Sequence, residues 1–331
     1  MTPLRTQVEQ EDNSLSEGKM IRTVLGDVSV DNLAGVCNAH EHIVMRGDWM
    51  QQHFAAFYRS NAKSILPDLE AFRAAGGGWL VDCTPPGAGR DAQVLADTSR
   101  LSGLSIIGAT GRHLPQYYHP DSSLLAMDRE ALADLFINEI TQGMNDGTGK
   151  TSFQAGVIKI ASSRGDLNEA ERELFAAAGA AQATTGCPII THTEAGTECQ
   201  QQIDTLVNHG AALDKVTLSH CDKNPDIEFH RDLLQTGVRL EYDQHFRYLR
   251  RQEKCATFAL AATLSEDFPT QLVVGMDLAR NEYWNGYDGA PGLAWLVSEL
   301  PNLLYKSGVS NEAIQRITTL NALEAFSFSA L

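Results

Sequence analysis

Two histidines one residue apart, His40 and His42, form the clearest chemical pattern in the sequence. On a β-strand, side chains at positions i and i+2 point to the same face, so both imidazole rings can reach one metal ion. A single pair of this kind also occurs for purely structural reasons. Three further residues with metal-binding side chains, His192, His220 and Asp277, stand at the ends of apolar runs. If those ends meet in space, the sequence predicts a metal centre.

Lys159 interrupts an otherwise apolar run over residues 155–161. An unpaired ammonium group is costly to bury. One interpretation is a lysine that points outward and extends its amine to solvent. The other is a lysine whose amine has reacted with carbon dioxide, giving an anionic carbamate whose two oxygens bridge two metal ions. Four histidine nitrogens, one aspartate and such a bridge suit zinc, with manganese or cobalt as alternatives.

Eight short runs, most of them apolar and followed by a predicted helix, must position these residues. The runs span 36–44, 79–84, 104–111, 155–161, 188–193, 215–220, 238–243 and 272–277, and the clearest helices are predicted over 68–77, 129–144, 167–186 and 311–326. The strand ends are spaced by roughly 34 residues, the length of one strand–helix unit of a parallel barrel. The sequence therefore predicts an α/β fold, a distorted (β/α)8 TIM barrel whose strand ends converge on one mouth. An open doubly wound sheet is disfavoured because no glycine-rich phosphate loop follows the first strand.

The chain is predicted to form one domain over 21–331, after a polar and flexible lead-in over 1–20. The domain begins with a β-hairpin that turns near Gly26 and Asp27. A net charge of −16 argues against nucleic acid or an anionic membrane as a partner. No signal segment and no membrane span is expected. The six cysteines form no Cys-x-x-Cys pair, which favours reduced thiols and a cytoplasmic protein, and a homodimer is the expected assembly.

The order of the motifs resembles the phosphotriesterase-like family of the amidohydrolase superfamily, in particular its lactonase and phosphotriesterase homology branch. The motifs are His-Glu-His at 40–42, Gly-Val-Ile-Lys at 156–159, Thr-His-Thr at 191–193, Ser-His-Cys-Asp at 219–222 and Gly-Met-Asp at 275–277. The resemblance implies that His40, His42 and Asp277 hold one metal, that His192 and His220 hold the other, and that carboxylated Lys159 bridges them. Ala322 departs from the family, which usually has proline there, but this position concerns a helix start.

Hydrolysis of an ester-type bond follows from such a centre. A hydroxide shared by two cations is a nucleophile near neutral pH, because metal binding lowers the pKa of water. Asp277 would act as the catalytic base, taking the proton of the hydroxide and passing it to the leaving group. Two other classes stay open, a non-hydrolytic barrel enzyme such as an aldolase and an inactive binding module. Neither class has a reason to keep all six ligands.

The loops after the third, seventh and eighth strands supply the predicted substrate contacts. His113 and Tyr117 follow the third strand and Arg247 the seventh, while Arg280 and Tyr283 follow Asp277 by three and six residues. Further basic residues of the seventh loop are Arg250, Arg251 and Lys254. These side chains are either solvated loop charges or a clamp for phosphate or carboxylate.

The spacing of Arg280 and Tyr283 resembles family members that act on phosphorylated sugar lactones. The small-molecule substrate is therefore predicted to be a lactone or carboxylic ester that carries an anionic group. Hydrolysis of organophosphate or phosphonate esters is expected as a side activity, and a phosphotriesterase or phosphodiesterase proper is the alternative.

Overall fold

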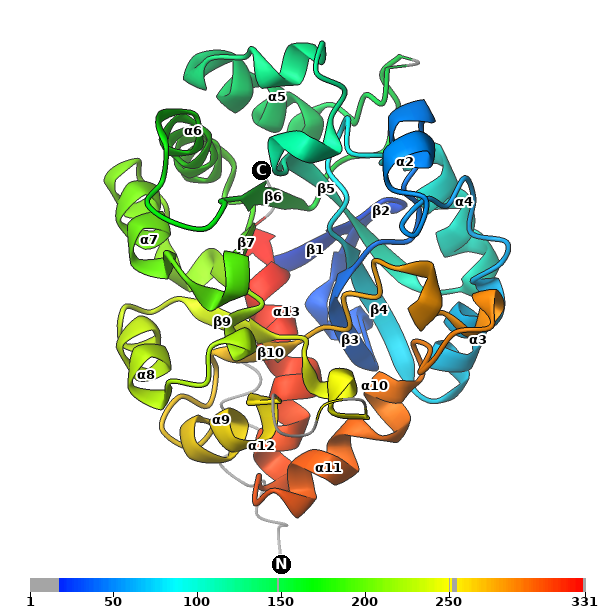
Figure 1. The fold of residues 1–331 in the computed structure, drawn as a ribbon, viewed down its shortest axis with the longest axis vertical. Helices are drawn as coiled ribbons and strands as arrows, with labels where there is room; N and C mark the ends of the chain where they lie inside the picture. Colours follow the sequence, from blue (N-terminus) through cyan, green and yellow to red (C-terminus); the bar gives the residue numbers. More distant parts are fainter. Residues whose placement is uncertain (1–17, 148, 250, 252–254, 330–331) are drawn as a thin grey trace, which may run out of the picture.

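A barrel of eight parallel strands forms the centre of the molecule, and a ring of helices surrounds it (Figure 1). The computed structural model describes residues 18–147, 149–249, 251 and 255–329. The barrel strands are β3 (Val36–Glu41), β4 (Gly77–Asp82), β5 (Ser105–Arg112), β6 (Val157–Ala161), β7 (Ile189–His192), β8 (Val216–Ser219), β9 (Arg239–Tyr242) and β10 (Leu272–Val274). Neighbours along the chain are neighbours in the sheet. Each predicted run overlaps one of these strands, so the predicted fold is confirmed.

The barrel closes between β3 and β10 through single hydrogen bonds and not through a regular ladder. The backbone N–H of Asp277 donates to the carbonyl of His40 at 2.9 Å, and that of Met276 donates to Oδ1 of Asn38 at 2.8 Å. The pairing of β3 with β4 also shifts register twice. The distortion thus lies at the strand that carries the His-Glu-His motif.

Side chains alternate between two cores along the strands, as expected for a sheet that is covered on both faces. In β4, Trp79 and Val81 point into the barrel, whereas Leu80 packs outward against the helices. In β9, Leu240 and Tyr242 belong to the outer core. Alternation therefore turns Glu241 inward.

Helices connect successive barrel strands and cover their outer faces. They are α2 (Asp48–His53), α3 (Leu66–Ala74), α4 (Ala92–Ser102), α5 (Arg129–Thr141), α6 (Glu169–Thr185), α7 (Cys199–Asn208), α8 (Ile227–Gln235), α9 (Thr257–Leu264), α10 (Trp295–Ser298), α11 (Leu300–Lys306), α12 (Asn311–Gln315) and α13 (Asn321–Phe326). Asn168 and Glu171 form a reciprocal capping box at the start of α6, and Gly186 ends this helix in the left-handed conformation. The helix predicted over 311–326 consists of α12 and α13 joined by a π-helical turn.

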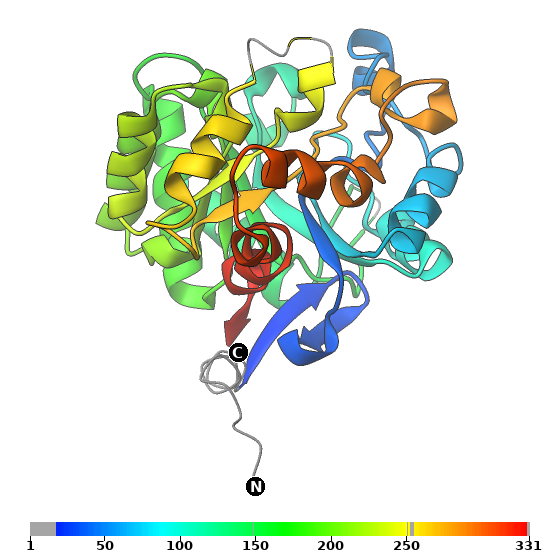
Figure 2. The ribbon, with the colours of Figure 1, turned by 90° about the horizontal axis from the view of Figure 1, so that it is seen from below.

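An antiparallel sheet of β2 (Gly26–Ser29), β1 (Lys19–Thr23) and β11 (Phe328–Ser329) lies at one end of the barrel. Figure 2 shows it opposite the loops that follow β3, β9 and β10. The predicted hairpin is present, but its turn is formed by Val24 and Leu25, two residues before the predicted position, because Thr23 pairs with Gly26. The buried Val24 explains this difference, since its backbone N–H binds the carbonyl of Ile106 in the barrel.

The domain begins earlier than predicted, because β1 includes residues 19 and 20. Most of the predicted flexible lead-in, residues 1–17, lies outside the described residues. Among the described residues, no helix is long and apolar enough to cross a membrane.

Candidate metal centre

The six predicted metal ligands gather at the C-terminal mouth of the barrel. His40 lies on β3, Lys159 on β6 and His192 on β7, and the remaining ligands follow the ends of β3, β8 and β10. The ring centres of His40 and His220 lie 4.9 Å apart, and those of His192 and His220 lie 4.7 Å apart. A cavity of about 250 Å³ opens here, lined by His40, His42, Met45, Phe57, Thr84, Pro85, Ala88, His113, Tyr117, His192, Glu194, His220, Lys223, Asp277 and Ala279.

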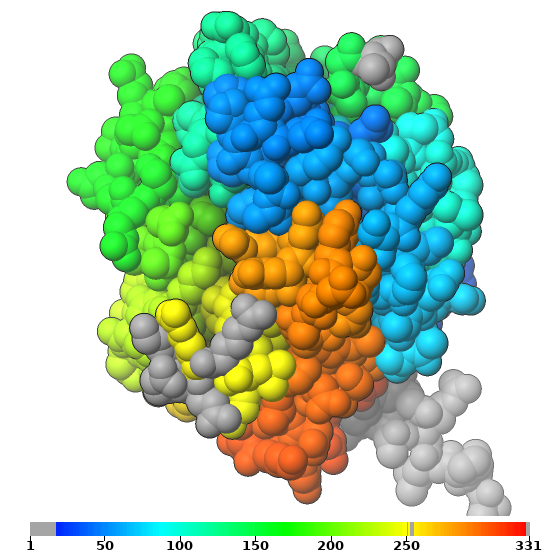
Figure 3. All heavy atoms as spheres, turned by 45° about the vertical axis from the view of Figure 1, so that its right-hand side comes forward, coloured from blue at the N-terminus to red at the C-terminus, as the bar shows by residue number. Residues whose placement is uncertain are grey.

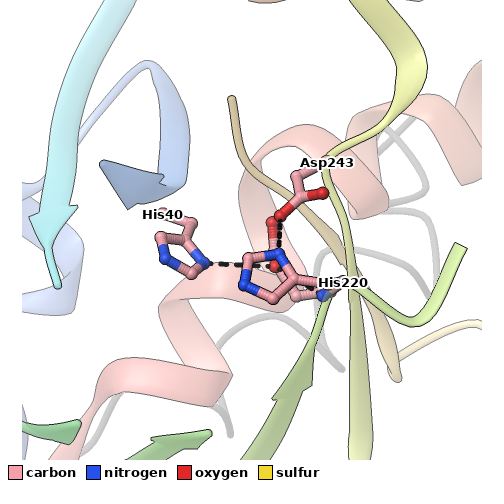
Figure 4. Close-up of side chains that lie close together, drawn as sticks. His40, His220 and Asp243 are labelled. Carbon is pink, nitrogen blue, oxygen red and sulfur yellow. Dashed lines mark hydrogen bonds and ion pairs between the residues drawn. The ribbon is translucent and has the colours of Figure 1, made fainter. Parts of the chain in front are cut away.

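Two buried carboxylates of the seventh barrel strand and its end hold two of the histidine rings (Figure 4). Oε2 of Glu241 lies 3.4 Å from Nδ1 of His40, and Oδ2 of Asp243 contacts Nδ1 of His220. Glu241 also accepts the backbone N–H of His220 at 3.3 Å. When both carboxyl groups are ionised, each accepts the proton of Nδ1, which leaves the lone pair of Nε2 for a metal ion.

The other two histidines are oriented by the same principle. Nδ1 of His42 lies 2.8 Å from the hydroxyl of Thr84, and Nε2 of His192 lies 3.2 Å from Oε2 of Glu194. His192 is thus held by its Nε2 atom, so its Nδ1 atom stays available. Every predicted histidine ligand has one engaged ring nitrogen and one available ring nitrogen, which is the arrangement that metal-binding histidines need.

The available nitrogens face other predicted ligands. Nε2 of His42 lies 3.7 Å from Oδ1 of Asp277, and Nε2 of His40 lies 3.4 Å from Nζ of Lys159. Ligand atoms of His40, His42 and Asp277 all lie within 4.8 Å of one another. Two imidazoles and a carboxylate at this separation fit a divalent ion such as zinc.

Burial sets the protonation of the site. It lowers the pKa of all four histidines. Nearby cationic groups add to this effect at His40 and His42, whereas the carboxylates of Glu194 and Asp243 oppose it at His192 and His220 without reversing it, so the rings are neutral and able to bind metal. Burial also raises the pKa of Asp277 to about 6, and the charge of a neighbouring aspartate contributes. A carboxyl group in this range can exchange a proton near neutral pH.

Two of the ligands have strained backbones. His220 and Asp277 have φ angles of 63° and 44°, in the left-handed region that non-glycine residues seldom occupy. Such conformations persist only where the surrounding structure enforces them, and they are concentrated at functional sites. Both side chains line the cavity, His220 directly after β8 and Asp277 three positions after the last residue of β10.

Lys159 is completely buried on β6. Among the described residues, its Nζ atom has one polar contact, Nε2 of His40. The snorkelling interpretation is therefore wrong, because alternation along β6 turns this side chain into the barrel. Within the part of the chain that the structure describes, no carboxylate forms an ion pair with this amine, although its charge acts on Glu241 and Asp277 and partly offsets the rise that burial causes in their pKa values.

Sequence reasoning missed the residues that hold the ligands. Glu241 and Asp243 could have been found from the alternation in Leu-Glu-Tyr-Asp, in which two acidic residues share the inward face of the seventh run. Glu194 and Lys223 each follow a ligand histidine within a short loop and line the cavity, but no sequence pattern distinguishes them. Glu41, which stands between two predicted ligands, accepts the backbone N–H of Leu278, the residue after Asp277, at 3.0 Å.

The predicted substrate contacts divide into two groups. His113 and Tyr117 line the cavity, and the ring centre of His113 lies 5.1 Å from that of His192. Arg247 lies behind Asp277, with Nη2 3.8 Å from Oδ2, and its guanidinium group stacks over Tyr283.

In the described part of the chain, neither Arg280 nor Tyr283 is among the residues that line the cavity. Nε of Arg280 is 3.1 Å from Oε1 of Glu282, and its guanidinium group lies over the ring of Phe57. The loop of Arg280 runs beside the loop that follows β3, where the N–H of Asn281 binds the carbonyl of Ala56 at 2.7 Å (Figure 3). Arg251 is exposed, and Arg250 and Lys254 lie outside the described residues.

Comparison with known proteins gives a consistent result. The sequence model of the phosphotriesterase family matches residues 19–326. A phospho-furanose lactonase of Mycoplasmopsis synoviae is 28% identical over 328 residues, covering 94% of this chain and 93% of that protein. An N-acetyltaurine hydrolase of Homo sapiens is 32% identical over 257 residues, covering 67% of this chain and 71% of that protein. The crystal structure of a lactonase from Listeria monocytogenes superposes with a TM-score of 0.86 at 25% identity, covering 94% of this chain and all of the other (100%).

Proposed function

Because the chain belongs to the phosphotriesterase family, we propose that it hydrolyses a lactone or carboxylic ester that carries an anionic group. It is a metal-dependent hydrolase with a site for two divalent ions and a small-molecule ester or lactone substrate. The observation that carries the proposal is the set of four neutral histidines, each with one ring nitrogen engaged and the other available, beside Asp277.

Zinc is the proposed metal, because imidazole and carboxylate are its usual ligands. His40, His42 and Asp277 would hold one ion, and His192 and His220 the other. A carbamate on Lys159 is the proposed bridge, since it would give the buried nitrogen an anionic group. When bound, the two ions supply an activated hydroxide and polarise the scissile carbonyl group.

The residues of the chain then position groups and move a proton. Asp277 takes the proton of the attacking water and gives it to the oxygen of the leaving group. Arg247 lies against the outer oxygen of this carboxylate and keeps it oriented. Glu241 and Asp243 hold two imidazole rings from below, so the ligands do not have to reorganise during turnover.

An anionic substrate is supported by the basic groups around the cavity. Lys223 lines the wall, and Arg280 lies at the rim over Phe57, a wall residue. The phospho-furanose lactonase similarity points to the same class. Met45, Phe57 and Pro85 give part of the wall an apolar surface, which leaves room for organophosphate esters as a side activity.

A hydrolysis screen with the metal-loaded protein tests the proposal. The panel contains phosphorylated furanose lactones, the same lactones without phosphate, aryl esters, organophosphate triesters and N-acetyltaurine. We expect the highest kcat/KM for a phosphorylated lactone, and a preference for neutral triesters would favour the phosphotriesterase alternative. Elemental analysis should find about two metal equivalents per chain. A protein that binds no metal would instead support an aldolase or a binding module.

A further inference from the structure

His113 is a cavity residue that the metal centre does not use. It follows β5, and its ring lies between Tyr117 and His192, with ring-centre distances of 4.9 and 5.1 Å. Its backbone N–H donates to the hydroxyl of the buried Tyr118 at 2.7 Å. The loop therefore holds this imidazole at a fixed place beside a ligand of the second metal.

The hydrogen bonds of His113 define its tautomer. Nδ1 accepts the backbone N–H of Leu114 at 2.8 Å, and an imidazole nitrogen can accept only through an unprotonated lone pair. The ring is therefore neutral and its proton resides on Nε2. A protonated Nε2 cannot bind a metal ion, but it can donate a hydrogen bond.

We propose that His113 is a catalytic residue whose Nε2–H donates a hydrogen bond to the carbonyl oxygen of the substrate as negative charge develops there. This inference rests on the proposed ester or lactone hydrolysis. The oxygen of water forms a bond to the acyl carbon, and the π electron pair of the carbonyl group moves to its oxygen. That pair then returns to re-form the carbonyl group, the bond to the leaving oxygen breaks with its electrons on that oxygen, and the oxygen receives the proton carried by Asp277.

His113 keeps its own proton throughout, so its contribution is electrostatic. A fixed N–H donor favours the transition state because the carbonyl oxygen is more negative there than in the bound substrate. A neutral imidazole is sufficient for this task, since donation needs only the N–H group.

The test compares His113→Phe with His113→Gln, which keeps an N–H donor, in protein loaded with metal. Dihydrocoumarin and 4-nitrophenyl acetate serve as probes. We expect His113→Phe to lower kcat by roughly 10²–10³-fold with little change in KM, as for removal of an oxyanion donor. His113→Gln should recover part of the loss. His119→Phe is the matched control, because His119 lies in the same loop with a side chain that is 60% exposed.

Two further measurements separate this inference from the proposed function. If wild type binds metal but hydrolyses no ester, the proposed function fails first. Long-range ¹H–¹⁵N correlation spectra of the metal-free protein report the tautomer directly, with the signal assigned by its loss in His113→Phe. A proton on Nδ1, an unchanged kcat in His113→Phe, a loss confined to KM, or loss of the metals would each overturn the inference.

Discussion

Nζ of Lys159 lies 3.4 Å from Nε2 of His40, although 119 positions separate these residues in the sequence. Both side chains are buried, and strands β6 and β3 direct them toward the same point inside the barrel mouth. An ammonium group could donate a hydrogen bond to this nitrogen, but it would then compete with a metal ion for the same lone pair. A carbamate on the same nitrogen would convert the contact into two ligands of neighbouring metal ions.

We therefore predict that Lys159→Ala loses bound metal and activity together. Short carboxylic acids should restore part of both, because their oxygens can replace those of the bridge. Elemental analysis measures the metal content, and a ¹³C NMR signal from protein prepared in ¹³CO₂ reports the carbamate. Full metal content in Lys159→Ala, or no carbamate signal in the wild type, would contradict the assignment.

Asp277→Asn should separate proton transfer from metal binding. The amide keeps the size of the side chain and one ligand oxygen but cannot accept a proton. We expect turnover to fall by roughly 10²–10⁴-fold, the usual contribution of a general base. Metal content, measured on the same sample, should be largely retained. Unchanged turnover at neutral pH would mean that another group carries the proton.

Metal affinity should depend on pH through Asp277, because burial raises the pKa of this carboxyl group to about 6. The carboxylate form binds the cation and predominates above that pH. Affinity should therefore weaken as pH falls through about 6, whereas the histidines, whose pKa values are lowered, stay neutral. Chelator competition at several pH values measures this fall in affinity. Asp277→Asn should not show it, and a fall in affinity near pH 6 that persists in this variant would identify another titrating ligand.

Glu241→Gln should weaken metal binding without weakening the fold. The carboxylate holds Nδ1 of His40 and the backbone N–H of His220, and loss of such a partner typically costs about 10–100-fold in metal affinity. A neutral amide is easier to bury than a carboxylate, so thermal unfolding of the metal-free variant should occur at or above the wild-type Tm. A large fall in that Tm would show a purely structural role.

Arg280→Met tests the anion clamp at the rim. If the guanidinium group leaves Glu282 to bind a substrate phosphate, the variant should lose about 2–3 kcal/mol of transition-state stabilisation, seen as a lower kcat/KM for an anionic lactone. A neutral aryl ester should be hardly affected. Arg129→Met is the matched control, because Arg129 has a comparably exposed side chain paired with Glu173 on another face. Equal losses on both substrates would make Arg280 a structural residue.

The barrel fold and most of the candidate metal site could be predicted from the sequence alone. Apolar runs at the spacing of strand–helix units predict the barrel, and the parallel topology brings their C-terminal ends together. For this reason all six predicted ligands, His220 among them, could be assigned to one site without coordinates. The resemblance of their motifs to a known family added how the ligands would be shared between two metals.

Tertiary structure decided which nitrogen of each ring is available, because a tautomer depends on a partner that is distant in the sequence. Glu241 holds His40 across 201 positions, and Thr84 holds His42 from just beyond the end of β4. It also decided that Arg280 lies at the rim, since the pairing with Glu282 and the packing on Phe57 depend on how two loops meet. Loop conformation follows contacts between segments and not a periodic pattern, so the strand ends were predictable, whereas the positions of Arg247, Arg280 and Tyr283 outside the cavity wall were not.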